Sequence, residues 1–209
     1  MFSSHRQVAD FMRGVVGGAV ILSLTGSVTV ALEVGKHERG NLKACERQLC
    51  EIVLGKEPTA KTLTCDLQKT WAKKSLKNGA ESKSINWSLG DARCKVDLAL
   101  AQQPLVDALT LPKYKLKLPE HAVNCVVERG GEITPVNLSL KPKLKFKRGK
   151  AVEASMGIGN IEAPALIKSA IWTVAKMESN FGLFQGDILR AVNKFVGKKC
   201  AKRYPELKP

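Results

Sequence analysis

Between residues 84 and 160, apolar and polar side chains alternate with a period of two. The alternation runs through "ARCKVDLAL", "KYKLKL" and "HAVNCVVERGGEI", in which Gly130-Gly131 is typical of a hairpin turn. It continues through "NLSLKPKLKFKRGK" and "KAVEASMGI". Because successive side chains of a strand point to opposite faces, each run predicts a strand with one buried face. The whole region predicts an antiparallel meander sheet of about five or six strands.

The segments on either side of this region have helical spacing instead. Residues 41–54 form one amphipathic pattern, and residues 64–79 predict a second helix, with Thr64 placed to cap its start and Asn78-Gly79 to end it. Residues 163–177 and 183–196 carry broad apolar stripes that a one-faced sheet can bury. The expected fold is therefore α+β: N-terminal helices, the meander sheet and two C-terminal amphipathic helices packed on it.

All the cysteines lie beyond the first 31 residues. Their number is even, which favours three disulfides and an oxidising compartment: Cys45, Cys50, Cys65, Cys94, Cys125 and Cys200. Zinc is the competing interpretation, but no Cys-x-x-Cys pair exists. On one helix the first two cysteines are separated by about 7.5 Å of rise, too far to bond, so they need different partners. We predict a Cys94–Cys125 bridge across the sheet, and the other four cysteines then tie the helices together.

The N-terminus carries a long uncharged segment. Residues 14–32 contain no charge and follow His5, Arg6 and Arg13. Such a segment is a signal peptide or an uncleaved membrane anchor, and either one exports the rest of the chain. We expect residues 1–31 to be a signal peptide cleaved after Ala31, and residues 32–209 to form a single α+β domain.

The chain is strongly basic. Its formal net charge is +15, and loss of Arg6, Arg13 and Asp10 with the signal peptide leaves +14. A surplus of this size attracts polyanions. Outside the cytoplasm the candidates are an anionic lipid or membrane surface and an acidic polysaccharide. Nucleic acid is not expected, because few aromatic residues are interleaved with the basic ones.

Two of the predicted strands are rich in lysine. In "NLSLKPKLKFKRGK" the apolar residues share one face and the lysines the other, and "KYKLKL" repeats the pattern. The candidate ligand-binding residues are Lys113, Lys115, Lys117, Lys141, Lys143, Lys145 and Lys147. A solvated face that discourages edge-to-edge aggregation is the alternative interpretation.

No catalytic motif is present. The sequence has no Gly-x-Ser-x-Gly, phosphate-binding loop or His-Glu-x-x-His, so we predict no catalytic residues, no metal site and no cofactor. We expect an exported, non-enzymatic binding protein for an anionic or amphipathic ligand, held by the basic face and an apolar pocket under the helices. The alternatives are a secreted hydrolase using His121 with a carboxylate, and a structural or envelope-interaction protein. The oligomeric state is not indicated.

Overall fold

The computed structural model describes residues 32–207. The predicted signal peptide or anchor, residues 1–31, lies outside these residues. Within residues 32–207, no helix is both long enough and apolar enough to cross a bilayer.

The larger sheet has five strands, joined throughout by antiparallel pairing in the order β1-β2-β4-β5-β8. Its strands are β1 (Thr62–Trp71), β2 (Ala92–Ala101), β4 (His121–Arg129), β5 (Glu132–Leu140) and β8 (Ile158–Glu162). The predicted hairpin at Gly130-Gly131 joins β4 to β5, and both glycines have positive φ, which glycine adopts without steric cost. The antiparallel sheet expected from the alternating pattern is confirmed.

A second, smaller sheet has the order β3-β6-β7. Its strands are β3 (Lys113–Lys117), β6 (Lys143–Lys147) and β7 (Lys150–Ser155). Backbone hydrogen bonds from Leu118 to Pro142 and from Lys141 to Gly157, both 3.0 Å, continue across the short connections to the larger sheet. The two sheets therefore form one bent layer. The bend requires glycine at position 157, where φ is +59° and a Cβ would lie 2.4 Å from the carbonyl oxygen of Lys141.

This bend divides two stretches that the sequence pattern treats as continuous. The leucines before Pro142 belong to β5 in the larger sheet, whereas Leu144 and Phe146 belong to β6 in the smaller one. In β7 the pairing with β6 shifts between Lys145 and Phe146. Because of this bulge, Val152 is exposed instead of sharing the buried face with Ala154.

The predicted helix at residues 64–79 is wrong in its first half. Residues up to Trp71 form β1, and the helix there, α2, covers only Lys73–Glu81. Leu63 and Cys65 alternate with exposed threonines and are buried against β2, so tertiary packing outweighs the local helical spacing. The helix begins where the Asp91 carboxylate accepts a hydrogen bond from the Lys73 backbone N–H at 2.7 Å.

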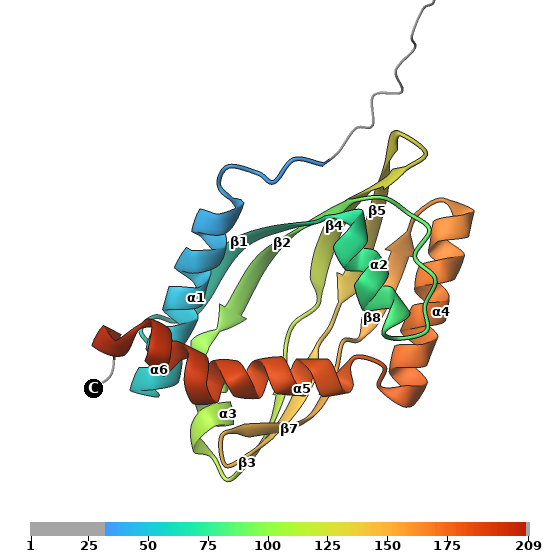
Figure 1. Cartoon of the computed structure of the whole chain (residues 1–209). Helices are drawn as coiled ribbons and strands as arrows, with labels where there is room; N and C mark the ends of the chain where they lie inside the picture. The colour runs from blue at the N-terminus through green and yellow to red at the C-terminus, as the bar shows by residue number, and fades with distance from the viewer. Residues whose placement is uncertain (1–31, 208–209) are drawn as a thin grey trace, which may run out of the picture.

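The remaining helices agree with the sequence pattern or extend it. The predicted helices at residues 41–54, 163–177 and 183–196 appear as α1 (Glu38–Gly55), α4 (Ala165–Phe181) and α5 (Gln185–Lys194). The helix α3 (Gln102–Thr110) joins β2 to β3, and α5 continues through a π-helical turn (Phe195–Lys199) into α6 (Cys200–Arg203) and a final 3₁₀ turn (Pro205–Leu207). The disulfide-stabilised α+β class is confirmed (Figure 1).

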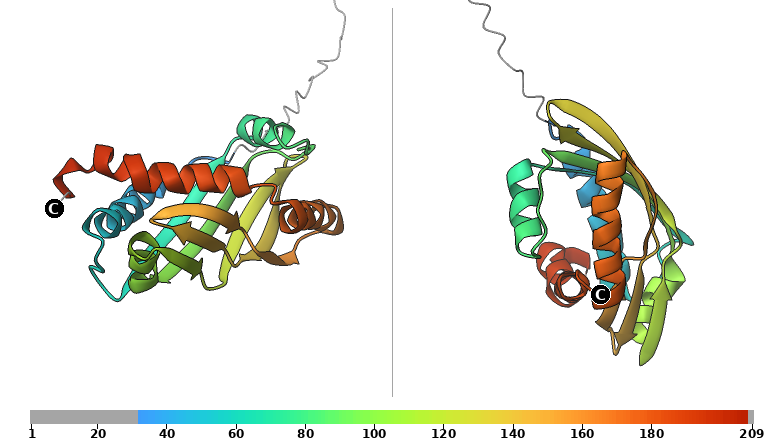
Figure 2. Two further views of the ribbon diagram at one scale, coloured as in Figure 1. Left: turned by 90° about the horizontal axis from the view of Figure 1, so that it is seen from below. Right: turned by 90° about the vertical axis from the view of Figure 1, so that its right-hand side faces the viewer.

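Helices cover one side of the strand layer. In the right-hand view of Figure 2 the strands form a curved layer, with α2, α4 and α5 on its concave side. Ile167 of α4 joins the core of the larger sheet, and Leu189 and Val192 of α5 pack against the core of the smaller one. The Asn193 side chain of α5 makes two 2.9 Å hydrogen bonds to the backbone of Ala151, and so pairs the N–H and C=O of this residue at the free edge of β7.

Three disulfides tie the elements together. Cys94 and Cys125 lie directly opposite each other on β2 and β4 and are bonded, as predicted. The other bridges are Cys45–Cys65 and Cys50–Cys200, so the two cysteines of α1 do have different partners. Cys50–Cys200 attaches the C-terminal helices to α1, whereas Cys65 lies on a strand, so the bridge to Cys45 joins a helix to the sheet.

A buried carboxylate holds the outer edge of β1. Glu38, at the start of α1, is 2% exposed and accepts hydrogen bonds from the backbone N–H and hydroxyl of Thr70 and from Lys69 Nζ. Burial by itself raises the pKa of Glu38, but these hydrogen bonds and the Lys69 charge outweigh it, and the pKa is lowered from its usual value.

Candidate functional site

The inner face of the larger sheet borders an apolar cavity of about 470 Å³. Side chains from all five strands line it, joined by Leu42 of α1, Ile171 of α4, and Leu118, Pro142 and Met156 at the bend. The strand residues include Leu67, Val96, Leu98, Val123, Leu138, Leu140 and Ile158. Ligand pockets have volumes of roughly 300–1,000 Å³ and mostly apolar walls. This cavity, which we call the sheet cavity, meets both conditions.

A second apolar space adjoins the first. It has a volume of about 300 Å³ and lies between α4 and the segment Ile85–Leu89, which includes Trp87. The side chain of Ile171, on α4, lines both spaces and lies between them. This part of α4 leaves apolar volume on both sides, unlike a close-packed core helix.

Hydrogen bonds and an ion pair link the helices on the concave side of the strand layer. Glu178 of α4 accepts hydrogen bonds from the backbone N–H groups of Met156, at the bend, and of Phe184, before α5. Lys83, after α2, lies 2.6 Å from Asp187 of α5. The hydrogen bond and charge of Lys83, with a smaller contribution from Arg190, lower the pKa of Asp187. These polar contacts thus link α4 to the bend and to the start of α5, and they link α5 to the segment after α2.

Polar groups are few in the wall of the sheet cavity. Lys69 is one of the lining residues, and its ammonium group lies 3.1 Å from the Glu38 carboxylate. His121 also lines the cavity, and its buried Nε2 has no hydrogen-bond partner within residues 32–207. The Nε2 atom of His121 therefore has no carboxylate partner among the described residues, which gives no support there to the alternative hydrolase.

The outer side of the smaller sheet carries most of the predicted ligand-binding lysines. The strands β3 and β6 pair over their full length, which sets Lys113 opposite Lys147, Lys115 opposite Lys145 and Lys117 opposite Lys143. All six side chains are exposed, whereas Leu116 and Phe146 on the other side of the strands are buried. We call these six residues the lysine face. The predicted separation of lysines and apolar residues onto opposite faces is confirmed for β3 and β6.

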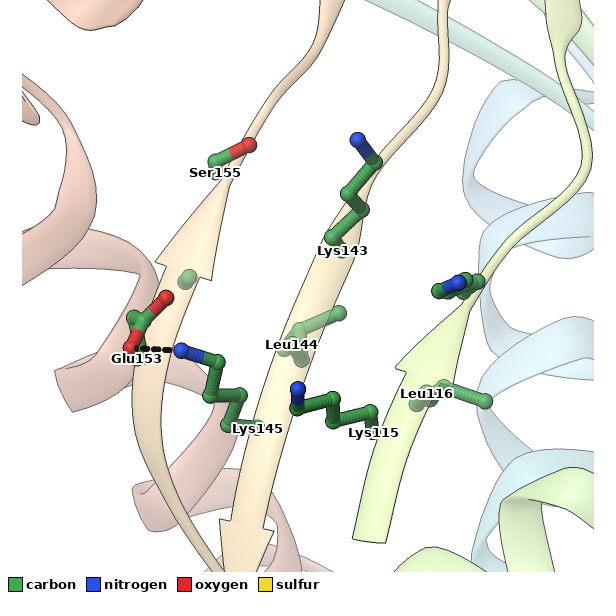
Figure 3. Close-up of a pocket in the computed structure, with 9 residues that line it drawn as sticks. Lys115, Leu116, Lys143, Leu144, Lys145, Glu153 and Ser155 are labelled. Atoms are coloured by element: carbon green, nitrogen blue, oxygen red, sulfur yellow. Dashed lines mark hydrogen bonds and ion pairs between the residues drawn. The ribbon is translucent and has the colours of Figure 1, made fainter. Parts of the chain in front are cut away.

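One carboxylate accompanies these six ammonium groups. The Glu153 carboxylate of β7 lies 2.6 Å from Lys145 Nζ. This is the only ion pair that the lysine face makes with any residue of the described chain. Figure 3 shows Lys115, Lys143 and Lys145 on the same side of the sheet, with Leu116 and Leu144 directed to the other side. Opposed like charges on neighbouring strands repel each other, so this arrangement opposes folding.

The seventh predicted lysine is not part of this arrangement. Lys141 lies in the bend, before β6 begins, and its backbone contacts Gly157. Two basic residues that the sequence reasoning did not include lie at the other end of the lysine face: Arg148 in the β6–β7 turn, and Lys150, which pairs with Lys147. The Arg-Gly pair at 148–149 was the available sequence signal for this turn.

The two features offer different chemistry. The sheet cavity can enclose a hydrocarbon group, and the lysine face can attract anions. No group of three or more His, Cys, Asp or Glu side chains in residues 32–207 has an arrangement that could hold a metal ion. Comparison with family models, with curated proteins and with solved structures finds no match, so the function of this chain has to be inferred from these two features.

Proposed function

We propose that this chain is an exported, non-enzymatic binding protein for an amphipathic lipid. The hydrocarbon part of the lipid occupies the sheet cavity, and the basic surface provides attraction for anionic groups. The observation that carries the proposal is the cavity of about 470 Å³ with almost continuous apolar walls.

The free energy of binding comes mainly from the removal of apolar surface from water. Each CH₂ group buried contributes about 0.8 kcal/mol, so a chain of several methylenes supplies an affinity useful for transport. An acidic polysaccharide gains little from such walls because it has few apolar groups to bury. The cavity therefore favours a lipid over a polysaccharide as the bound ligand.

The three disulfides support export, because such bonds persist in oxidising compartments outside the cytoplasm. They also fix the frame of the cavity. Cys94–Cys125 lies in its wall, and Cys45–Cys65 attaches α1, which contributes Leu42, to β1. A frame held by covalent bonds can keep a cavity open without the packing that a filled core would provide.

A pair of tryptophan substitutions on one strand tests the proposal. Leu138 and Ile133 both lie on β5, but Leu138 lines the sheet cavity whereas Ile133 is exposed on the other face. With a dansyl-labelled fatty acid as the probe, we expect Leu138→Trp to weaken binding at least tenfold, because the indole occupies the space for the chain. Ile133→Trp is expected to bind as the unmodified protein does.

Two results would contradict the proposal. One is the absence of saturable binding of the probe to the unmodified protein. The other is equal affinity of the Leu138→Trp and Ile133→Trp variants, which would place the probe elsewhere and leave a structural or envelope-interaction role. Thermal unfolding of both variants checks that the substitutions leave the fold intact.

A further inference from the structure

We infer that the lysine face docks on the surface of an anionic lipid bilayer. This inference deepens the proposed function by naming the partner of the basic surface. It rests on that proposal for one point, that the ligand of this protein is a lipid. The sheet cavity is bordered by α4, and the buried side of β3 and β6 packs against α5, whereas the lysines are exposed on the other side of these strands, so each feature can be tested without the other.

The charges on the lysine face are almost all of one sign. Three consecutive lysine pairs lie directly opposite each other, and only Lys145 has a carboxylate partner among the residues described. A face needed only for solubility would mix both signs, since opposed like charges weaken strand pairing. An external layer of anions removes this repulsion and explains why the arrangement is tolerated.

The lysine face is broad and open. The six side chains extend from two fully paired strands and border two hollows that share Lys115 and Lys145, so their ammonium groups are spread over a broad area of the sheet. The aromatic residues of these strands, Tyr114 and Phe146, border the hollow between the lysines, but Phe146 is buried and Tyr114 is half-buried against the same core, so neither offers an exposed ring on which bases could stack. A broad array of cations fits an extended anionic surface better than it fits a single chain.

Two exposed apolar side chains lie beside the lysines. Leu111 is 42% exposed and lies between α3 and β3, two residues before Lys113 at the start of β3. Val152, 43% exposed, borders a shallow hollow with Lys113, Lys115, Lys145 and Lys147. Leucine and valine next to lysines gain free energy in the head-group region of a bilayer. A hydrophilic polysaccharide offers them no such environment, so we assign the bilayer as the partner.

Sedimentation with lipid vesicles tests the assignment. We expect the protein to bind vesicles of phosphatidylcholine mixed with phosphatidylglycerol and not vesicles of phosphatidylcholine alone. Near an anionic surface each lysine contributes about a fivefold change in partitioning. The triple variant Lys115→Gln, Lys117→Gln, Lys143→Gln should therefore bind about a hundredfold more weakly at low salt, and added salt should weaken binding of the unmodified protein.

A matched triple variant controls for net charge. Lys43, Lys74 and Lys168 are exposed, lie on α1, α2 and α4, and make no ion pair with a described residue. Their replacement by glutamine removes the same charge from other surfaces, and we expect a loss of binding below tenfold. Equal losses in the two triple variants would overturn the assignment, because binding would then depend on net charge alone.

Two further measurements locate the contact and its partner. In the Leu111→Trp variant, brominated lipids in the vesicle should quench the fluorescence of the tryptophan introduced at position 111. Quenching only of native tryptophans, such as Trp172, which is 53% exposed on α4, would assign docking to α4 and overturn the inference. Retention on immobilised heparin without vesicle binding would overturn it in favour of a polysaccharide. The Leu138→Trp variant should still bind vesicles, so failure of the cavity and failure of docking are distinguishable.

Discussion

The outer faces of the two sheets use charge in opposite ways. On the larger sheet, Asp66 of β1 lies opposite Asp97 of β2, and Lys95 is within 3.4 Å of the first and 3.7 Å of the second. On the smaller sheet, three lysine pairs lie opposite each other with Glu153 as their one partner in the described chain. Both faces are exposed and antiparallel, so neither burial nor strand geometry explains the difference.

The charges on the larger sheet stabilise the fold, whereas those on the smaller sheet do not. Lys95 reduces the repulsion between two aspartates and so contributes to the larger sheet. The lysine face has no such arrangement, and its charges are available to a partner outside the molecule. The two sheets are nevertheless joined at the bend into one layer. Substitutions at the bend, at the β1 edge and on each outer face can therefore test the comparison.

The largest effect on stability is expected for Gly157→Ala, which breaks the connection between the sheets. The backbone there has φ of +59°, and a Cβ would lie 2.4 Å from the carbonyl oxygen of Lys141. Strain in φ and the steric contact together should lower the free energy of unfolding by about 3 kcal/mol. Urea unfolding monitored by circular dichroism measures this loss as a lower transition midpoint.

Gly79→Ala is the matched control. Gly79 lies inside α2, its φ is not in the left-handed region, and no atom lies within 4 Å of the position of a Cβ. The substitution should stabilise the protein by up to about 1 kcal/mol, because alanine favours a helix interior. If both variants were equally stable, the bend would not depend on glycine, and the two sheets would be less tightly coupled than the structure indicates.

The bend also explains which features the sequence could predict. Alternation is a local property of a strand, so the exposure of Lys113 and Lys147 and the Cys94–Cys125 pairing follow from counting positions. A bend joining two sheets depends on contacts distant in sequence, so Lys141 is grouped with lysines from which the bend separates it. The helix predicted across Trp71 fails for a related reason: burial of Leu63 and Cys65 against β2 is a tertiary effect. The general position of an apolar pocket follows from a one-faced sheet with helices. Its volume depends on the three-dimensional packing, and so does the burial of His121 Nε2 without a partner in residues 32–207.

The next effect is expected at the outer edge of β1, where Glu38 is buried. Because hydrogen bonds from Thr70 and Lys69 lower its pKa in the folded state, the carboxylate stabilises the protein above the pKa of the unfolded chain. That contribution is lost as the pH falls through the lowered folded-state pKa. Glu38→Gln should lower the free energy of unfolding by about 2 kcal/mol at neutral pH, since hydrogen bonds to a charged group are replaced by weaker ones.

The sign of the pH dependence distinguishes this role from simple packing. The difference between the unmodified protein and Glu38→Gln should be largest near neutral pH and should shrink below the usual pKa of glutamate. Glu57, which is exposed and has no ion pair with the described residues, provides the control, and Glu57→Gln should change stability by less than about 0.5 kcal/mol. A pH-independent difference for Glu38→Gln would show that the charge of the buried carboxylate contributes nothing.

The smallest effects are expected on the two outer faces, and there the signs should be opposite. Lys115→Gln with Lys117→Gln removes repulsion from two cross-strand pairs and leaves the Lys145–Glu153 contact intact, so the free energy of unfolding should rise by about 1 kcal/mol. Lys95→Gln exposes the Asp66–Asp97 pair to its own repulsion and should lower the free energy of unfolding by about 0.5 kcal/mol. Urea, which is uncharged, is the suitable denaturant, and both differences should shrink as salt is added. Destabilisation by the double lysine variant would show that the lysine face contributes to the fold, and the argument that its charges are available to an anionic surface would then lose its physical basis.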